Sequence, residues 1–375
     1  MNLSILSAFI FIAVFAGVVF IHEFGHFIVA RLLKVEVEEF GFGLPPRMLT
    51  LFHYKGTEFT LNWLPIGGFV RPKGENDPNV AGGLAAANPW TRLAVLLAGP
   101  TMNLLLGVAV FSLLFFQMGV PDFTKVQIGD VVTASPAAQA GLQVNDVIVS
   151  AAGVAIHDST QLHDIIYANL DKPVQFTLRR GSQTINLTAT PDSKRPQGQG
   201  ALGISMGPAM VQAGSPLESL QYGSLAVYEQ ARLLILLPAQ MVRGQVNPQD
   251  SRFVGLKGIY DLFGQAVSRD VQSREPITSS PSTTPAPAGS QTPTYFTLQL
   301  IGILTISLGV LNLFPFPALD GGHILFVLPE LILRRRIPAR WENGINAAGM
   351  ALLLVFMVYV NVMDFVNPAI INLPK

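Results

Sequence analysis

The chain has 375 residues, a formal net charge of +0, 50% hydrophobic residues and only 13% charged residues. This apolar balance excludes an ordinary soluble domain, and the neutral charge gives no reason to expect a nucleic-acid partner. The sequence contains no cysteine, which excludes disulfides and thiolate metal ligands and leaves histidines and carboxylates as candidate ligands.

The first apolar segment, at about 3–30, carries a His-Glu-x-x-His motif near its end. On a helix, His22 and His26 lie about 6 Å apart along one face, where two imidazoles can bind one Zn²⁺. Glu23 beside them can take a proton from a water molecule at the metal. Ionisable side chains in an apolar span each cost roughly 2.5–3.5 kcal/mol on insertion, which favours a functional site over a chance motif. The segment lacks the basic start of a cleaved signal peptide, so we expect a retained span.

Four apolar segments are long enough to cross a bilayer, which takes about 20 residues each. They lie at about 3–30, 93–118, 296–317 and 345–364. Lysines and arginines concentrate in the loops 31–92 and 318–344, so the positive-inside rule places these loops in the cytoplasm and the region 119–295 on the other side. We therefore predict a polytopic α-helical membrane protein with about four transmembrane helices.

The loop 35–72 alternates apolar and polar residues around glycine-marked bends, which predicts a membrane-associated β-hairpin on the cytoplasmic side. An edge strand from 57–70 could pair with an extended peptide, and Gly67, Gly68 and Phe69 are candidate substrate-positioning residues. The simpler alternative is a plain cytoplasmic hairpin. We assign residues 1–118 to the first half of a membrane core and residues 295–375 to its second half.

Residues 122–192 resemble a PDZ domain, an α+β fold that we expect to be inserted outside the cytoplasm. The resemblance rests on the run from Ser135 to Leu142 and on Asn145-Asp146-Val147-Ile148. It implies capture of an extended peptide or substrate segment, and a lid or size filter is the alternative. We read 193–271 as an extension with interfacial amphipathic helices and 272–294, rich in Pro, Ser and Thr, as a disordered linker.

A zinc site with two histidines needs a third protein ligand and an open position. Asp320 is the only carboxylate near the end of the third apolar segment, where Pro315 and Pro317 break the helix. His22 and His26 lie roughly 8–14 Å inside the end of the first span, so both motifs approach the cytoplasmic half of the membrane.

Taken together, these motifs resemble the site-2 protease family of intramembrane zinc metalloproteases, in particular the branch that includes the regulator of sigma-E protease. The resemblance implies one zinc per chain held by His22, His26 and Asp320, with Glu23 activating water. It implies further that the hairpin guides the substrate. The motifs that carry it are His22-Glu23-x-x-His26, Gly99-Pro100-x-x-Asn103, Asn312-x-x-Pro315 and Leu319-Asp320-Gly321-Gly322-His323. In this pattern Asn103 and Asn312 would position the substrate. His323 would either contact a metal ligand or make a purely structural polar contact.

The function that follows is an intramembrane zinc endopeptidase in a bacterial cytoplasmic membrane. Its substrate would be a single-span protein, such as an anti-sigma factor or a remnant signal peptide. One alternative is a membrane-anchored PDZ adaptor with a structural metal site, and Glu23 beside an open coordination position argues against it. A second is a transporter, but the second and fourth spans carry no ionisable residue in their centres.

Overall fold

The computed structural model describes residues 3–75, 77–195, 200–245, 253–274 and 295–366. For residues 65 and 66 it describes the backbone alone. Two compact units divide the chain: Met1–Leu114 with Leu220–Ile370, and Phe115–Ser219. The helices are α1 Leu3–Leu32, α2 Pro89–Met118, α3 Pro136–Ala140, α4 Ser159–Ala168, α5 Pro216–Val242, α6 Leu256–Gln272, α7 Phe296–Asn312, α8 Asp320–Leu333 and α9 Ala339–Val366. The strands are β1 Val37–Tyr54, β2 Thr57–Pro72, β3 Val120–Val131, β4 Val147–Ala151, β5 Val154–Ala155, β6 Val174–Arg180, β7 Gln183–Ala189 and β8 Ile204–Val211.

Within the described residues, three helices are long and apolar enough to cross a membrane: α1, α2 and α9. The fourth expected span, 296–317, is shorter in the structure, because α7 stops at Asn312 after 17 residues. At 1.5 Å per residue it is about 25 Å long, less than the roughly 30 Å of a hydrocarbon core. Leu313 to Leu319 then form a tight turn into α8.

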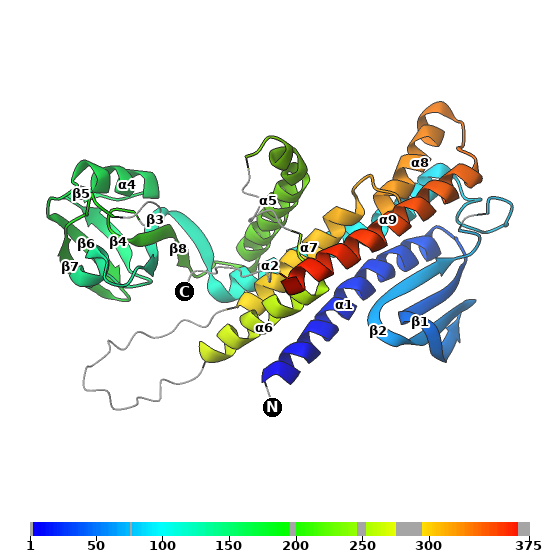
Figure 1. Ribbon diagram of the computed structural model, residues 1–375, viewed down its shortest axis with the longest axis horizontal. Coiled ribbons are helices and arrows are strands. Elements are labelled where there is room, and N and C mark those ends of the chain that lie inside the picture. The colour runs from blue at the N-terminus through cyan, green and yellow to red at the C-terminus, as the bar shows by residue number, and fades with distance from the viewer. Residues whose placement is uncertain (1–2, 76, 196–199, 246–252, 275–294, 367–375) are drawn as a thin grey trace. The chain divides into compact units, whose positions relative to one another are not determined.

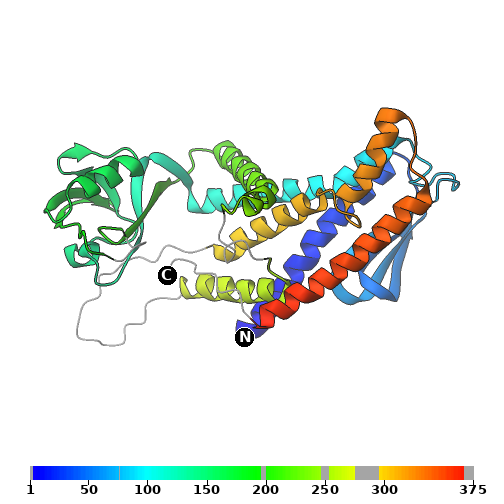
Figure 2. The same cartoon turned by 45° about the horizontal axis from the view of Figure 1, so that its top comes forward.

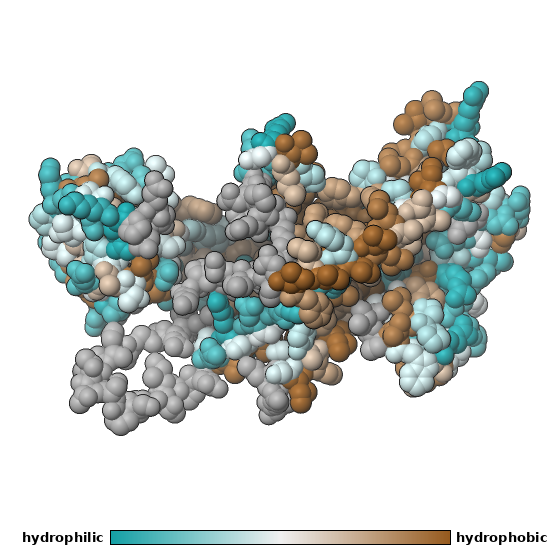
Figure 3. Space-filling model, viewed as in Figure 1, coloured by the Kyte–Doolittle hydropathy of each residue, from teal (hydrophilic) through white to brown (hydrophobic). Residues whose placement is uncertain are grey.

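The first unit is a bundle in which α1, α6, α7 and α9 lie alongside one another (Figures 1 and 2). Helix α2 packs closely on α7, since a Cβ at Gly309 would lie 3.0 Å from Pro100 O. Carboxylates fix the ends of α6 and α7: Asp364 accepts the N–H groups of Gly255 and Gly258, and Asp270 accepts those at the start of α7. In Figure 3 apolar side chains gather over α9 and its neighbours, as a membrane-facing surface requires.

The predicted hairpin is a folded sheet in which β1 pairs with two parts of β2. Phe40 lies opposite both Phe59 and Val70. The 57–62 part of β2 is also paired with the end of β1, because Phe59 lies opposite Phe52 as well. This part is therefore internal to the sheet. The 68–72 part pairs with β1 on one side only and forms the edge that lies along α1.

A buried carboxylate holds this doubled pairing together. Glu39 is 3% exposed and accepts hydrogen bonds from Thr60 Oγ1 at 2.8 Å and from Arg71 Nη2 at 2.5 Å, which belong to the two parts of β2. Arg47 Nη2 adds a third contact at 2.8 Å. A buried charge is tolerated only with such partners, so Glu39 joins both parts of β2 to one strand.

The second unit contains an antiparallel sheet in the order β7-β6-β4-β3-β8, with β5 paired to β4. Helices α3 and α4 pack on its core, which includes Phe176 and Leu178, and Asp146 forms a buried ion pair with Arg180. The unit extends beyond the expected range 122–192, because β8 at Ile204–Val211 pairs with β3. The expected linker 272–294 falls almost entirely outside the described residues.

Candidate metal centre

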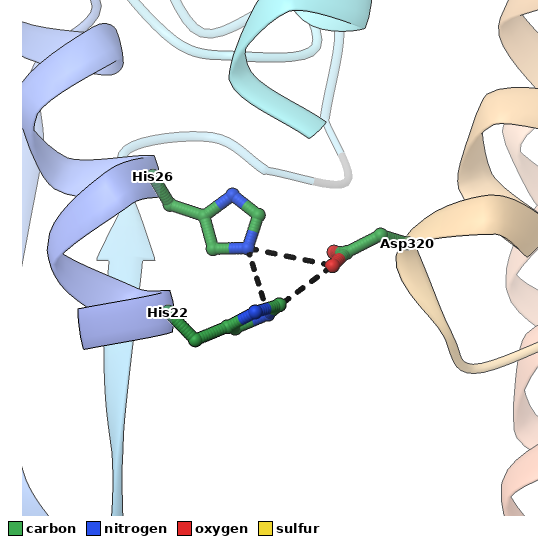
Figure 4. Close-up of side chains that lie close together, drawn as sticks. All are labelled: His22, His26 and Asp320. Atoms are coloured by element: carbon green, nitrogen blue, oxygen red, sulfur yellow. Dashed lines mark hydrogen bonds and ion pairs between the residues drawn. The ribbon is translucent and has the colours of Figure 1, made fainter. Parts of the chain in front are cut away.

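Three side chains from two distant parts of the chain converge near the C-terminal end of α1 (Figure 4). His22 and His26 lie one turn apart on α1, and Asp320 is the first residue of α8. His22 Nε2 lies 3.2 Å from His26 Nε2 and 3.2 Å from Asp320 Oδ2. The third side of the triangle, from His26 Nε2 to Asp320 Oδ2, is 3.5 Å.

The triangle fits a zinc ion. Ligand atoms 2.0–2.1 Å from tetrahedral zinc are about 3.3 Å apart, which matches all three sides. Asp320 Oδ2 is buried and accepts no hydrogen bond from the described protein atoms. The two imidazole nitrogens lie 3.2 and 3.5 Å from this oxygen, and a cation held among the three atoms would neutralise the buried carboxylate. The structure thus brings together the three residues that the sequence proposes as ligands.

Both histidines are oriented from helix α2. The proton on His26 Nδ1 is donated to the backbone oxygen of Val95 at 2.7 Å. His22 Nδ1 lies 3.3 Å from the side-chain amide of Asn103, which is 0% exposed. The nearer amide atom is Nδ2, a donor, and Oδ1 has no partner. A histidine that binds metal through Nε2 carries its proton on Nδ1, so the amide of Asn103 must be turned by about 180° for Oδ1 to accept that proton.

The two asparagines expected to position substrate occupy different places. Asn103 sits behind His22, on the side of the ring away from Asp320, and is fully buried. Asn312, at the end of α7, has Nδ2 only 3.3 Å from His22 Nε2, the nitrogen that faces the metal. An amide donor there can reach a carbonyl oxygen bound at the metal, whereas Asn103 can act only through His22.

Glu23 lies beside the ligands but is not one of them. Its Oε2 accepts a hydrogen bond from Val70 N at 3.0 Å, so the edge of the hairpin touches the candidate catalytic carboxylate. Gly68 is also close, since a Cβ there would lie 3.8 Å from Glu23 Cγ. Gly67 to Phe69 therefore lie along the site, where the sequence predicts substrate contacts.

His323 lies one turn after Asp320, and its polar contacts are with α9. Its Nδ1 is 3.6 Å from Glu342 Oε1 and 3.4 Å from Asn346 Nδ2. The side chain therefore joins α8 to α9, and any effect on the metal would pass through the position of α8.

Close packing explains the glycines of the motifs. A Cβ at Gly99 would lie 2.2 Å from His26 Nε2, and one at Gly25 would lie 2.6 Å from Ala98 O. Helices α1 and α2 can therefore meet at this depth only through glycine. A Cβ at Gly321 would lie 2.2 Å from Phe314 O, so glycine is also needed for the turn that presents Asp320.

Two supporting features were not predicted from the sequence. The first is the backbone carbonyl of Val95, which accepts the hydrogen bond from His26 and cannot be recognised from the residue type at position 95. Arg92 Nη1 pairs with Glu330 Oε2 at 2.6 Å, and this largely buried ion pair fastens the start of α2 to α8. In the sequence Arg92 is one of several cations between the first and second apolar segments, so only a structure can identify its partner across the fold.

Comparison with known proteins agrees with this centre. Peptidase family M50 matches residues 10–356. A protein of Clostridium perfringens (strain 13 / Type A), named "Putative zinc metalloprotease CPE1693", is 32% identical over 358 residues, covering 94% of this chain and 97% of its own. The metalloprotease MmpA of Caulobacter vibrioides is 28% identical, and the alignment covers 92% of each chain.

Among solved structures, the PDZ domain of the SdrC-like protein from Listeria monocytogenes aligns with 22% of this chain and 88% of its own, at 21% identity and a TM-score of 0.21. The family match includes His22, His26 and Asp320, and the two alignments cover 97% and 92% of the relatives' own lengths. With His22, His26 and Asp320 arranged as zinc ligands, the chain belongs to peptidase family M50 and is a zinc metalloprotease.

Proposed function

We propose that this metalloprotease is an intramembrane endopeptidase that cuts a single-span membrane protein within or near its membrane segment. The observation that carries the proposal is the position of the site. His22, Glu23 and His26 all lie inside α1, a 30-residue apolar helix long enough to cross a bilayer. The scissile peptide bond of a substrate must therefore lie within the membrane or at its surface when it is cut.

The residues divide the chemistry among them. When bound, zinc polarises the scissile carbonyl and lowers the pKa of a water molecule. Glu23 accepts the proton of that water and passes it to the leaving amine, while the Val70 N–H holds its carboxylate in place. The side-chain N–H of Asn312 donates a hydrogen bond to the carbonyl oxygen of the scissile bond. Asn103 acts as a positioning residue by fixing the ring of His22.

The free edge of the hairpin supports a way to present the substrate. A helical substrate must unwind locally, and each backbone group left unsatisfied in a membrane costs several kcal/mol. The 68–72 edge of β2 pairs with β1 on one side only. Since the Val70 N–H points away from β1, the N–H of Gly68 two residues earlier points the same way and can pair with an extended substrate.

The charge pattern supports a cytoplasmic-membrane location with the site toward the cytoplasm, because the loops 31–92 and 318–344 carry most of the lysines and arginines that flank the spans. The sheet unit at Phe115–Ser219 would then lie outside the cytoplasm and bind an extended segment of the substrate. Membrane-tethered regulators such as anti-sigma factors, and remnant signal peptides, are substrates of the required kind.

The test uses detergent-purified protein and tagged single-span substrates. Glu23→Gln should keep zinc and fold but lose hydrolysis, because an amide cannot accept the proton. Glu38→Gln is the matched control, since Glu38 is exposed on the hairpin. A zinc chelator should stop the wild type. Near wild-type cleavage by Glu23→Gln would exclude Glu23 as the base, and a wild type that cuts only soluble peptides would exclude the membrane substrate.

A further inference from the structure

An apolar cavity of about 320 Å³ lies between α1 and the hairpin, and Glu23 is the only ionisable side chain among its described lining residues. Its volume lies at the lower end of the range for ligand pockets, about 300–1,000 Å³. Three aromatic rings form one wall. Phe20 stacks on Phe42 with centroids 5.5 Å apart, and Phe40 meets Phe20 edge-on at 5.6 Å.

Several glycines line the cavity, and the structure explains some of them by packing but not Gly17. Gly41 is required by packing, because a Cβ there would lie 2.3 Å from the ring of Phe69. Gly17 is exposed on α1, and a Cβ there would meet no atom within 4 Å. Glycine is disfavoured inside a helix relative to alanine, and no packing contact explains it at position 17. The space above Gly17 is therefore free to hold something other than the protein's own side chains.

The cavity is continuous with the reaction site. Glu23 closes one end, and Gly68, on the free edge of β2, lies close to the Glu23 side chain. From Glu23 the wall follows one face of α1 through Phe20 to Gly17 and Ala16, about 10 Å along the helix. A substrate strand paired with the β2 edge would direct alternate side chains toward α1, and the side chain nearest Glu23 would point at this opening.

We propose that this cavity is a side-chain specificity pocket that takes a large apolar residue of the substrate, such as Phe, Leu or Met, next to the scissile bond. The inference rests on the proposed function and deepens it. Gly17 and the rings of Phe20 and Phe42 set the size and character of the pocket. An acidic substrate residue is excluded because it would be desolvated opposite the carboxylate of Glu23 without a partner.

The first test compares substrates that differ only at the residues flanking the cleavage site, with that site located by mass spectrometry. Gly17→Leu fills the pocket, whereas Ala13→Leu adds the same bulk at another exposed position of α1 outside the lining. At one flanking position, Gly17→Leu should lower the ratio of kcat/KM for Phe over Ala by about tenfold or more. Ala13→Leu should leave the ratio unchanged. An unchanged ratio in Gly17→Leu with retained zinc would overturn the proposal.

The second test does not depend on cleavage. Glu23→Gln protein is mixed with a series of single-span substrates that each carry a photoreactive phenylalanine at a different position of the membrane segment, and the crosslinked peptides are mapped. Adducts on 16–20 or 40–43 are expected, and adducts only outside the lining would refute the pocket. Slowing of every substrate alike by Gly17→Leu, in lipid vesicles but not in detergent, would assign the cavity to a lipid chain instead. Failure of the wild type to cut any single-span substrate would count against the proposed function, while the crosslinks would still report on the pocket.

Discussion

Replacing Gly99 with alanine should displace the zinc ligands, although residue 99 binds no metal itself. The new Cβ would lie 2.2 Å from His26 Nε2 and 2.8 Å from His22 Cε1, whereas Cβ contacts below 3.4 Å are uncommon. The ring of His26 or the backbone of α2 must therefore move by about 1 Å, because a packed interior leaves no free volume to absorb the methyl group.

Neither group can move freely. The ring of His26 is held by its hydrogen bond to Val95 O, and α2 is held against α1 where Gly25 meets Ala98. Metal sites tolerate ligand displacements of about 0.2 Å, and a misplacement of about 1 Å can cost on the order of 100-fold in rate. We expect Gly99→Ala to bind less than one zinc per chain and to lose about 100-fold or more in kcat/KM.

Zinc per chain is measured by elemental analysis on detergent-purified protein, in parallel with cleavage of a single-span substrate. Gly107→Ala is the matched control on the same helix. Its Cβ would lie 2.7 Å from the side chain of Ile306, which is 0% exposed and binds no metal, so this variant reports the effect of a comparable clash away from the ligands. If Gly99→Ala keeps one zinc per chain and cuts at the wild-type rate, the close approach of α2 to the histidines does not constrain the site.

Other changes test the remaining parts of the structure. Asp320→Ala should lower zinc content while the fold is retained, and full zinc occupancy would exclude it as the third ligand. Gly68→Pro should slow cleavage more than Gly68→Ala, since both add a Cβ 3.0 Å from Gly41 O but only proline removes the outward N–H; equal rates would argue against strand pairing. Arg180→Met leaves Asp146, 0% exposed, with one backbone donor and should destabilise the sheet unit by about 3 kcal/mol in hydrogen exchange. A topology reporter inserted after residue 181 should report a location outside the cytoplasm, and a cytoplasmic signal would reverse the proposed orientation.

The candidate ligands were predictable from the sequence, the two histidines from their spacing and Asp320 from its place near the end of the third apolar segment together with the family resemblance. The spacing of His22 and His26 fixes one face of a helix, and Asp320 is the only nearby carboxylate at a matching depth. Their convergence in the structure follows from these two facts. The partners of the ligands were not predictable, since the Val95 carbonyl and the burial of Asn103 depend on how α2 crosses α1.

The differences in fold have equally specific causes. Strand β8 is missed because Ile204–Val211 reads Ile-Ser-Met-Gly-Pro-Ala-Met-Val, in which glycine and proline interrupt any alternation. The third apolar segment reads as one span to 317, but the chain turns after Asn312 so that Gly321 can pack on Phe314 O. Hydropathy records the apolar residues of that turn and cannot show that they are no longer helical.

The wide separation of the ligands along the chain has a consequence for synthesis. His22 and His26 leave the ribosome first, and roughly 300 residues follow before Asp320 appears. At about 5–20 residues per second, the nascent protein spends about 15–60 s with two imidazoles and no carboxylate opposite them. A two-ligand site lacks the coordination that a catalytic zinc requires. With Asp320 as the third ligand, the site would be completed only after residue 320 is made, and a chain that stops earlier would leave no active protease in the membrane.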